Sequence, residues 1–478
     1  MAPSNTYIVA LDCGSTSFKA AIFDQHCHRL SEGSIAVPYT IQDSERVEMD
    51  AEAIWNCTLT LLRKIGVKAG IPPNQWTTIV ITSQAQTFTI VDDAKHPQFP
   101  LLSWLDKRAI VEATELASHF GVSFHNHCTV PSPLPQLQVA KLLWIRHHHP
   151  KIFTPDIKIV SLPGFLTLRL SALNLTDHNL AAMSGLYSLQ QRGWWKEVLN
   201  FCDLTKSQLP MLIEMGRPIP SQASCHELAP PSQKTSWTLA LAGNDQTAGA
   251  YANRSHKGEF IVTLGTALVV YRYAGQEPGP YHPFGFWGPY PGGGFYELAT
   301  RNEGCLALDW ARNHLMPGAD VKTFIQHAES VSSTELNNDT SLNVILFDPT
   351  RIQTENAWVG TGNLEQKTRA VLEGIGFSLR QLIFEDLQAD TEFSSLCIIG
   401  GGSQSSFWLQ LLANILNRPV RRGDGDSLLG AAMMVFSQEK LPIASATDYL
   451  SPEPQSVALE DQRFNLWKKT FRAIAAEK

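Results

Sequence analysis

The sequence predicts an α/β protein of two domains, in which helices cover the mixed sheet of each domain. The chain has 478 residues, which is too long for a single hydrophobic core. Two similar hairpin patterns occupy residues 7–24 and 258–273, one in each half of the chain. After each hairpin, apolar strand segments alternate with segments of helical periodicity, which is typical of mixed sheets covered by helices.

The first half opens with the hairpin 7–24 and continues with alternating elements. Strands are expected at 33–40, 76–81, 88–92 and, as a short strand and loop, 100–108. Residues 157–170 indicate a strand, a turn and a helix, and residues 176–189 a loop and a strand. Helices are expected at 49–69, 109–120, 137–148 and 193–201.

The second half follows a segment rich in proline and serine, residues 217–237, where we expect a loop-rich approach to the region between the domains. An apolar strand at 237–242 leads to a helix from Thr247, and the second hairpin begins at Phe260. Glycine, proline and aromatic residues in 281–295 predict a folded loop. The remaining expected elements are helices at 302–315, 367–387, 406–416 and 426–436 and a buried strand at 396–399.

Composition excludes several classes of protein. The formal charge of −7 and the pI near 6.1 argue against a nucleic-acid surface. No apolar run is long enough to span a membrane, and the N-terminus lacks the pattern of a signal peptide. The eight cysteines show no CxxC spacing and indicate reduced thiols, so we expect a cytoplasmic protein.

Both hairpins have turns suited to holding phosphate. The first turn contains Gly14, Ser15 and Thr16, and the second contains Gly265 and Thr266. Glycine lets backbone N–H groups approach an anion closely, and the hydroxyl groups add donors. Either turn alone also fits an ordinary hairpin, whereas the pair indicates two related domains that face one polyphosphate.

Two carboxylates stand at strand ends. Asp12 precedes the first turn, where a Mg²⁺ ion would have to separate it from phosphate. The alternative is an aspartate that only caps the turn. Asp245 lies between an apolar strand and a helix, and it suits a general base that takes the proton of an attacking hydroxyl group. The alternative is an ordinary helix N-cap.

A third glycine-rich segment, residues 400–403, follows an apolar strand and precedes a helix. Such a loop suits the close approach of a planar base or a phosphate, although triple glycines occur for many reasons. The chain contains neither GxxxxGK[ST] nor GxGxxG after a strand. If it binds ATP, it therefore uses another scaffold.

Together these segments resemble the FGGY carbohydrate kinases, which belong to the actin, hexokinase and Hsp70 ATPase-fold superfamily. The resemblance covers the chain from about Tyr7 to about Phe436, with the motifs in family order. The segments that carry it are LDCGSTSFKAAIFD, PLLSWLDKRA, TDHNLAAMSGLYSL, AGNDQTAGA, VTLGTALVV, GGGSQSSFWLQ and DGDSLLGAAMMVF.

The resemblance implies two ribonuclease H-like (actin-type ATPase) domains with a cleft between them. We expect the N-terminal domain, with the sugar side and the first phosphate hairpin, at 1–245. We expect the C-terminal domain, with the second phosphate hairpin and the adenosine side, at 246–440. Residues 441–478 are expected to form a tail that packs on the core, and closure is expected about residues 240–258.

The resemblance also assigns roles to residues at matching positions. Asp245 is the expected general base, and Asp12 and Asp245 are the expected metal-side residues. The sugar or polyol side is expected to contain Gln84, Gln86, Trp104, Asn244 and Asp245. The ATP side is expected to contain Gly14, Ser15, Thr16, Lys19, Gly265, Thr266, Gly401, Gly402 and Gln404.

The acceptor segment departs from two branches of the family. Glycerol kinases carry an Arg-Glu pair where this chain has Ala85 and Gln86, and xylulokinases usually carry Met-His. Neutral Gln84 and Gln86 can donate and accept hydrogen bonds, which suits sugar hydroxyl groups. We therefore expect a neutral ketose or alditol rather than a sugar acid.

The resulting expectation is a cytoplasmic, ATP- and Mg²⁺-dependent kinase of a small sugar or polyol. A catalytically idle or chaperone-like member of the same superfamily is the alternative. No nucleic-acid or membrane partner is expected, and a homodimer is the default assembly. Which sugar is used, and which of its hydroxyl groups, does not follow from the sequence.

Overall fold

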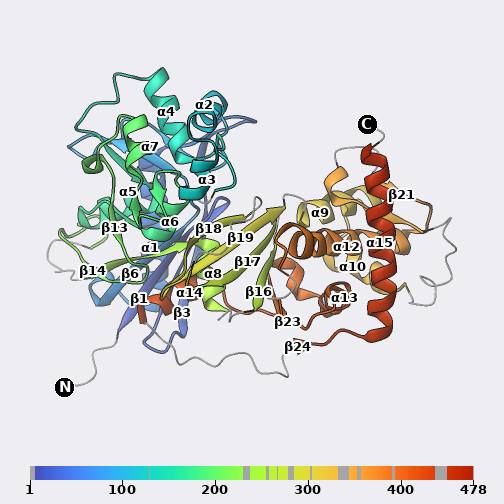
Figure 1. Ribbon diagram of the computed structural model, residues 1–478. Helices are drawn as coiled ribbons and strands as arrows, with labels where there is room; N and C mark the ends of the chain where they lie inside the picture. Colours follow the sequence, from blue (N-terminus) through green and yellow to red (C-terminus); the bar gives the residue numbers. More distant parts are fainter. Residues whose placement is uncertain are drawn as a thin grey trace.

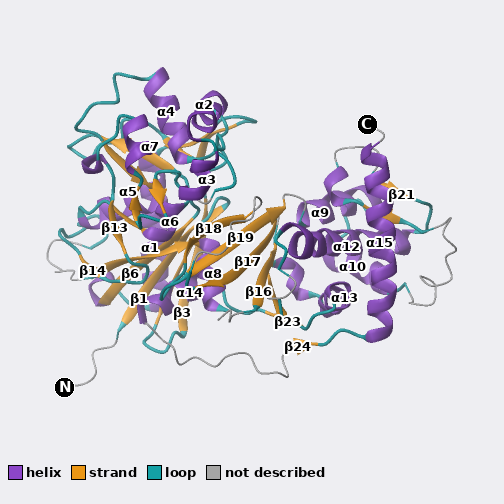
Figure 2. Ribbon diagram, in the orientation of Figure 1, coloured by secondary structure: helices purple, strands orange, loops and turns teal. Residues whose placement is uncertain are grey.

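Two lobes lie side by side in the computed structural model of the protein (Figure 1). The structure describes residues 6–476 except 129, 230–236, 254–257, 266, 278–284, 302–303, 332–343, 353–356, 390–392 and 437–448. The N-terminal half of the chain forms one lobe, and most of the C-terminal half forms the other. Both lobes combine a sheet with helices, and in the C-terminal lobe the strands lie toward the first lobe with most of the helices beyond them (Figure 2).

The sheet of the N-terminal lobe has six strands in the order β14-β15-β6-β1-β2-β3. Strands β1, β2 and β3 are antiparallel neighbours, and β6 and β15 continue the sheet in parallel with β1. Their bounds are β1 Tyr7–Cys13, β2 Ser17–Phe23, β3 Arg29–Ala36, β6 Trp76–Ser83, β14 Ile219–Pro220 and β15 Thr238–Asn244.

The sheet of the C-terminal lobe repeats this arrangement within seven strands, β18-β19-β17-β16-β22-β23-β24. Here β16, β17 and β19 are antiparallel neighbours, and β22 and β23 continue in parallel with β16. The bounds are β16 Glu259–Leu264, β17 Leu268–Gly275, β18 Gly285–Pro289, β19 Phe295–Arg301, β22 Ser395–Ile399, β23 Val420–Arg422 and β24 Tyr449–Leu450. The repeated strand order confirms the prediction of two related α/β domains with mixed sheets.

The long helices begin and end where their sequences dictate. Helix α1, Ala51–Ala69, starts at Asp50, whose side chain accepts the N–H of Ala53, and ends at Gly70 in the left-handed region. Helix α12, Leu364–Gln381, has a capping box at Asn363 and continues as a π-helical turn over Leu382–Asp386. Both helices bury an apolar face against the sheet of their own lobe.

A second part of the N-terminal lobe, at the top left of Figure 1, is built on a five-stranded sheet in the order β4-β5-β8-β7-β9. The strands are β4 Tyr39–Gln42, β5 Val47–Met49, β7 Phe88–Val91, β8 Leu101–Leu102 and β9 Lys158–Ser161. The nearby helices are α2 Ile110–Phe120, α3 Val122–Cys128, α4 Gln138–His148, α5 Leu162–Ser171, α6 His178–Ala182 and α7 Lys196–Phe201.

Two helices join the lobes. Helix α8, Asp245–Ala252, follows the last strand of the N-terminal core sheet, and α14, Ser427–Phe436, follows the C-terminal sheet. Both belong to the second half of the sequence, yet Ala248 and Leu428 lie in one hydrophobic cluster with Ile8 and Val80 of the N-terminal sheet. The two helices therefore pack on each other and on that sheet.

The C-terminal helix α15, Pro454–Ala476, packs along the outside of the second lobe (Figure 1). Phe464 and Trp467 are buried in its core together with residues of α12 and of α13, Ser406–Leu416. Trp467 Nε1 donates to the carbonyl of Phe347 at 2.8 Å.

The structure corrects two local predictions. Residues 176–189 contain a short helix, α6, because the side chain of Asp177 caps it by accepting the N–H of Leu180. The segment 281–295 is not only a folded loop, since β18 and the start of β19 lie in it, and aromatic residues on a half-buried sheet explain its composition. Helices α10, Val321–Glu329, and α15 were not predicted.

Several absences bear on function. All eight cysteines are free thiols. No helix among the described residues is long and apolar enough to cross a membrane. Within the same described part of the chain, no three His, Cys, Asp or Glu side chains come together as a metal cluster.

Candidate functional site

The carboxyl ends of three parallel strands bring four of the predicted site residues to one edge of the N-terminal sheet. Asp12 on β1 lies opposite Thr82 on β6, and Asn244 on β15 lies opposite Ser83. Gln84 follows β6 directly, and Asp245 follows β15. In α/β sheets this edge is where reactive groups gather.

Asp12 is buried and only partly satisfied. Its Oδ2 accepts a hydrogen bond from the Ser427 hydroxyl at 2.6 Å, and its Oδ1 is buried without a hydrogen-bond partner. Burial and the neighbouring Asp245 raise the pKa of Asp12 to about 7, against the opposing effects of Ser427 and Lys19. The side chain of Asp12 is therefore held by a residue from the far end of the chain and not by the N–H groups of its own turn.

Asp245 is the first residue of α8 and does not cap it. Asn244 is the N-cap, and its side chain accepts the N–H of Thr247 at 2.9 Å. The Asp245 carboxylate accepts the backbone N–H of Gln246 at 3.0 Å, and burial raises its pKa. Because the cap is supplied by Asn244, the Asp245 carboxylate remains available for chemistry.

Asn244 and Asn179 hold this loop together. The Asn244 side chain donates to Asn179 Oδ1 at 2.8 Å, and Asn179 in turn donates to Thr247 and to the carbonyl of Pro289 on β18. The Asn244 amide is therefore engaged with protein groups in this structure. Its geometry suits holding Asp245 in place, and a direct role in acceptor binding stays a prediction.

The first phosphate turn lies beside these carboxylates. Lys19 faces Asp12 across the β1–β2 ladder, and its charge acts on both Asp12 and Asp245. Gly14 and Ser15 are partly exposed and Thr16 is exposed, so the turn is accessible. The Tyr39 hydroxyl donates to the Ser15 carbonyl at 2.7 Å, which fixes the turn from outside.

The second turn and the glycine-rich segment meet at the matching edge of the C-terminal sheet. Gly265 follows β16, and Gly400 follows the parallel neighbour β22 in the left-handed region. A Cβ on Gly400 would stand 2.7 Å from the carbonyl oxygen of Leu264, so the two segments are in contact. Gly401 borders open space, whereas Gly402 packs on Leu264 and Trp408.

Gln404 is exposed at the end of the same 3₁₀ turn, Gly401–Gln404. Thr266 lies outside the described residues. One hydrogen bond connects the two edges: Thr263 Oγ1 on β16 donates to Gln246 Oε1 at 2.9 Å. The residue next to Asp245 is therefore tied to the strand that leads into Gly265.

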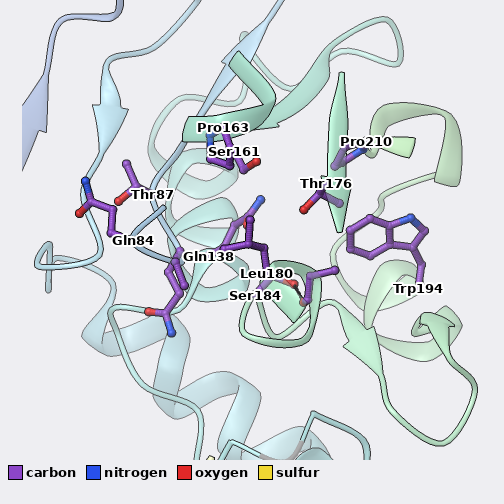
Figure 3. A pocket seen from close by; sticks show the side chains of 13 residues that line it. Gln84, Thr87, Gln138, Ser161, Pro163, Thr176, Leu180, Ser184, Trp194 and Pro210 are labelled. Carbon is purple, nitrogen blue, oxygen red and sulfur yellow. Dashed lines mark hydrogen bonds between the residues drawn. The ribbon is translucent and has the colours of Figure 1, made fainter. Parts of the chain in front are cut away.

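A small pocket opens in the N-terminal lobe next to Gln84 (Figure 3). Of the five residues expected on the acceptor side, it includes Gln84 and Gln86 but not Trp104, Asn244 or Asp245. Trp104 is 39% exposed, and its backbone N–H donates to Thr87 Oγ1 at 3.0 Å. The lining residues are Gln84, Ala85, Gln86, Thr87, Gln138, Ser161, Pro163, Thr176, Leu180, Ala181, Ser184, Trp194 and Pro210.

No charged side chain lines this pocket. Gln84 Oε1 is buried without a hydrogen-bond partner, so an acceptor atom is free for a ligand. Sequence reasoning missed Gln138, Thr176 and Trp194, because they reach the pocket from α4, β10 (Leu175–Asp177) and β12 (Gly193–Trp194). The TDHN segment that contains Thr176 was recognised, but nothing local shows which of its side chains face a cavity.

The carboxylates fit a hydrated divalent cation better than a resident metal. A buried, unpartnered oxygen on Asp12 suits a water-mediated or direct ligand of Mg²⁺, which prefers few protein carboxylates plus phosphate and water oxygens. The negative charge of Asp245 acts on Asp12, so a second carboxylate lies close by.

Comparison with protein families covers both lobes. Residues 7–237 match the model described as the FGGY family of carbohydrate kinases, N-terminal domain. Residues 261–438 match the model of the same family's C-terminal domain.

Individual relatives agree over almost the full chain. A xylulose kinase of Lactococcus lactis is 24% identical, over 98% of this chain and 97% of its own. A glycerol kinase of Streptococcus pneumoniae is 23% identical, over 98% and 97%. The solved structure of a gluconate kinase of Lactobacillus acidophilus covers 99% of each chain with a TM-score of 0.83 at 20% identity. Since these three proteins are named for a ketose, a polyol and a sugar acid, similarity alone leaves the acceptor open.

Proposed function

Because the chain belongs to the FGGY family of carbohydrate kinases, we propose that it transfers the γ-phosphate of ATP to a hydroxyl group of a small neutral sugar or polyol. The observation that carries this proposal is the pair of carboxylates, buried Asp12 and partly buried Asp245, at the strand edge that also bears the first phosphate turn. Phosphoryl transfer needs positioning, charge neutralisation and a base, and this edge supplies a residue for each.

We assign Asp245 the role of general base. Burial raises its pKa, which strengthens the carboxylate as a proton acceptor at neutral pH. It would accept the proton of the acceptor hydroxyl group as that oxygen attacks the γ-phosphorus in line. Lys19, close enough for its charge to act on both carboxylates, would help to offset negative charge at the transferred group.

We assign the ATP side to the two turns. Backbone N–H groups and hydroxyls of Gly14, Ser15 and Thr16 would contact phosphate from one lobe, and Gly265 and Thr266 from the other. Gly401, Gly402 and Gln404 would border the adenosine, and the open space at Gly401 is compatible with that role. A Mg²⁺ ion bound with ATP would be held on the Asp12 side and would neutralise phosphate charge.

We assign the acceptor to the neutral pocket beside Gln84. Its free amide oxygen, its hydroxyl-bearing side chains and Trp194 suit hydroxyl groups and C–H faces of a sugar, whereas a carboxylate would find no cation among the lining residues. This supports a ketose or an alditol over a sugar acid. The alternative of an idle or chaperone-like ATPase gains no support, since Asp12, Lys19 and Asp245 are all in place.

The test is nucleotide turnover with a panel of acceptors. ADP release is measured with MgATP alone and with added ketoses, alditols, aldoses and sugar acids. We expect release to require a neutral acceptor and a phosphorylated product to form in equal amount. ADP release that is indifferent to every acceptor, or fastest with a sugar acid, would contradict the proposal.

Other sequence-based expectations stay predictions. These are the domain limits 1–245 and 246–440 with the tail 441–478, Mg²⁺ as the cation, a homodimer and a cytoplasmic location. Turnover measured with Mg²⁺ and with Ca²⁺ would test the cation, and sedimentation would test the homodimer.

A further inference from the structure

Lys141 is a fully buried lysine without a carboxylate partner among the described residues. It lies on α4, one turn after the pocket residue Gln138. Its Nζ donates to the carbonyl of Gln86 at 3.0 Å and to the carbonyl of Ser103 at 2.8 Å. Burying an amine without a close counter-ion is costly. The contacts that offset this cost are the two hydrogen bonds and the ring of Phe88, whose centroid lies 5.6 Å from Nζ.

The two carbonyls belong to separate segments of the acceptor side. Gln86 lines the pocket and has a φ of 66°, in the left-handed region that few non-glycine residues adopt. Ser103 immediately precedes Trp104. The segments flank the short antiparallel pairing of β7 with β8, in which Phe88 faces Leu102. Lys141 therefore joins the chain just before β7 to the chain just after β8.

The donor count of the side chain matches this arrangement. Burial lowers the pKa of Lys141 to about 7, with Asp106 opposing the shift and Arg108 adding to it. A neutral amine has two N–H donors and an ammonium has three. Either form can therefore satisfy both carbonyls, and the cross-link does not depend on the charge.

A second hydrogen bond joins the same two segments. The backbone N–H of Trp104 donates to Thr87 Oγ1 at 3.0 Å, and Thr87 also lines the pocket. Without Lys141, the Gln86 carbonyl would lose this donor, and the left-handed turn at Gln86 would lose its tie to α4.

We propose that Lys141 is a positioning residue of the acceptor pocket, which holds the Gln84–Gln86 segment and Trp104 in a fixed relation. The inference rests on the proposed function, because it takes this pocket as the acceptor site. It makes no claim that Lys141 touches the acceptor or the phosphate. A lysine that only stabilised α4 would affect folding without separating acceptor binding from ATP binding.

The experiment compares KM values for the acceptor and for ATP in Lys141→Met, which keeps the stem but removes both donors. We expect the acceptor KM to rise about tenfold or more, because a hydrogen bond at a strained turn is lost. The ATP KM should stay within about twofold, since the nucleotide elements lie on other segments. Binding of the acceptor alone by calorimetry gives a second readout.

Two further variants separate positioning from stability. Ile145→Val removes a methyl group from the buried face of the same helix and should lower the melting temperature without changing the ratio of the two KM values. Lys141→Gln keeps two N–H donors on a shorter side chain, so its acceptor KM should fall between those of wild type and Lys141→Met. If the Met variant does not fold, the Gln variant is judged by the same ratio.

The outcomes are distinct. An unchanged ratio of acceptor KM to ATP KM in a folded Lys141 variant, or an equal rise in both, overturns the proposal for Lys141. Absence of acceptor-dependent turnover in the wild-type protein overturns the proposed function instead.

Discussion

At the scale of single residues, the division of labour between Asn244 and Asp245 gives the sharpest test of the chemistry. Asn244 caps α8, so the Asp245 carboxylate is not needed to start the helix. We expect Asp245→Asn to fold with an unchanged or slightly higher melting temperature, because a buried charge is removed. We expect kcat to fall by about 10² or more, because the base is lost. Steady-state kinetics and a melting curve check both expectations.

The neighbouring variant Asn244→Ala serves as the control for this pair. It removes the cap and should cost about 1 kcal/mol of stability. Its melting temperature should therefore fall where that of Asp245→Asn does not. Turnover of Asp245→Asn within tenfold of wild type would remove Asp245 from the role of base.

Two exposed positions allow the ATP side and the acceptor side to be separated. A Cβ on Gly401 would meet no atom within 4 Å, so Gly401→Ala should leave the fold intact and raise the KM for ATP severalfold by crowding the nucleotide. Trp104→Ala should instead raise the KM for the acceptor and leave the KM for ATP unchanged. The measurement is both KM values in both variants. Equal changes in the two constants for either variant would contradict the assignment of that residue.

The functional residues at the ends of strands could be predicted from the sequence, but the residues that they contact could not. Asp12, Gln84 and Asp245 follow apolar strands, which the sequence displays directly. Ser427 lies far along the chain from Asp12, yet its hydroxyl holds the Asp12 carboxylate. No local pattern reports such a contact, since it depends on how α14 returns to the first sheet.

At the scale of elements, the attachment of α15 depends on a buried network of two arginines and two glutamates. Burial acts to raise the pKa of Glu373, but Arg463 and Arg369 outweigh it and lower that pKa. Burial and the like charge of Glu373 raise the pKa of Glu460 to about 7. Glu373 therefore binds the arginines as a carboxylate, and Glu460 is the member whose ionisation is costly.

A stability difference that depends on pH follows for Glu460→Gln. The unfolded chain ionises Glu460 near pH 4.5, whereas the folded chain does so near pH 7. Stability is therefore lost as pH rises through this window, and the glutamine variant avoids that loss. We expect its melting temperature relative to wild type to increase from pH 5 to pH 8. Thermal unfolding across this range is the measurement.

Glu373→Gln is the matched control in the same network. It leaves Arg369 and Arg463 buried with a weaker partner and should cost about 3–5 kcal/mol. If Glu460→Gln destabilised the protein as much as Glu373→Gln at every pH, this account of the network would be wrong.

Elements with a strong periodic pattern were predicted well, and short or amphipathic elements at the periphery were not. Helix α13 was predicted with the bounds that it has, because an apolar run is flanked by Ser405 and Asn417. Helix α6 is only five residues long and depends on one cap, so no periodicity can mark it. Strand β18 escaped prediction because glycine and proline in it are typical of loops.

At the scale of the whole molecule, the repeat of the core was visible in sequence because both copies begin with the same hairpin. The sequence did not show how the two copies are joined. Helices α8 and α14 cross between the lobes and carry Asp245 and Ser427 at their first positions. Closure was expected about residues 240–258, and α14 packs on α8, which lies within that segment. The distance between the carboxylates is therefore linked to the packing of these two helices.

Gly430 tests this link, because a Cβ built on it would overlap the carbonyl of Ala248 in α8. An alanine within a helix is normally favourable by about 1 kcal/mol relative to glycine, so any loss of stability in Gly430→Ala must come from forcing the helices apart. We expect a loss of about 1–3 kcal/mol by chemical denaturation. We also expect a fall in kcat, because α14 carries Ser427 away from Asp12.

Gly249→Ala on α8 is the control. The Cβ of an alanine there would lie 3.7 Å from Ile399, which is an ordinary contact, so the stability of this variant should equal or exceed that of wild type. If both variants retain wild-type stability and turnover, the packing of α8 on α14 does not set the geometry of the site.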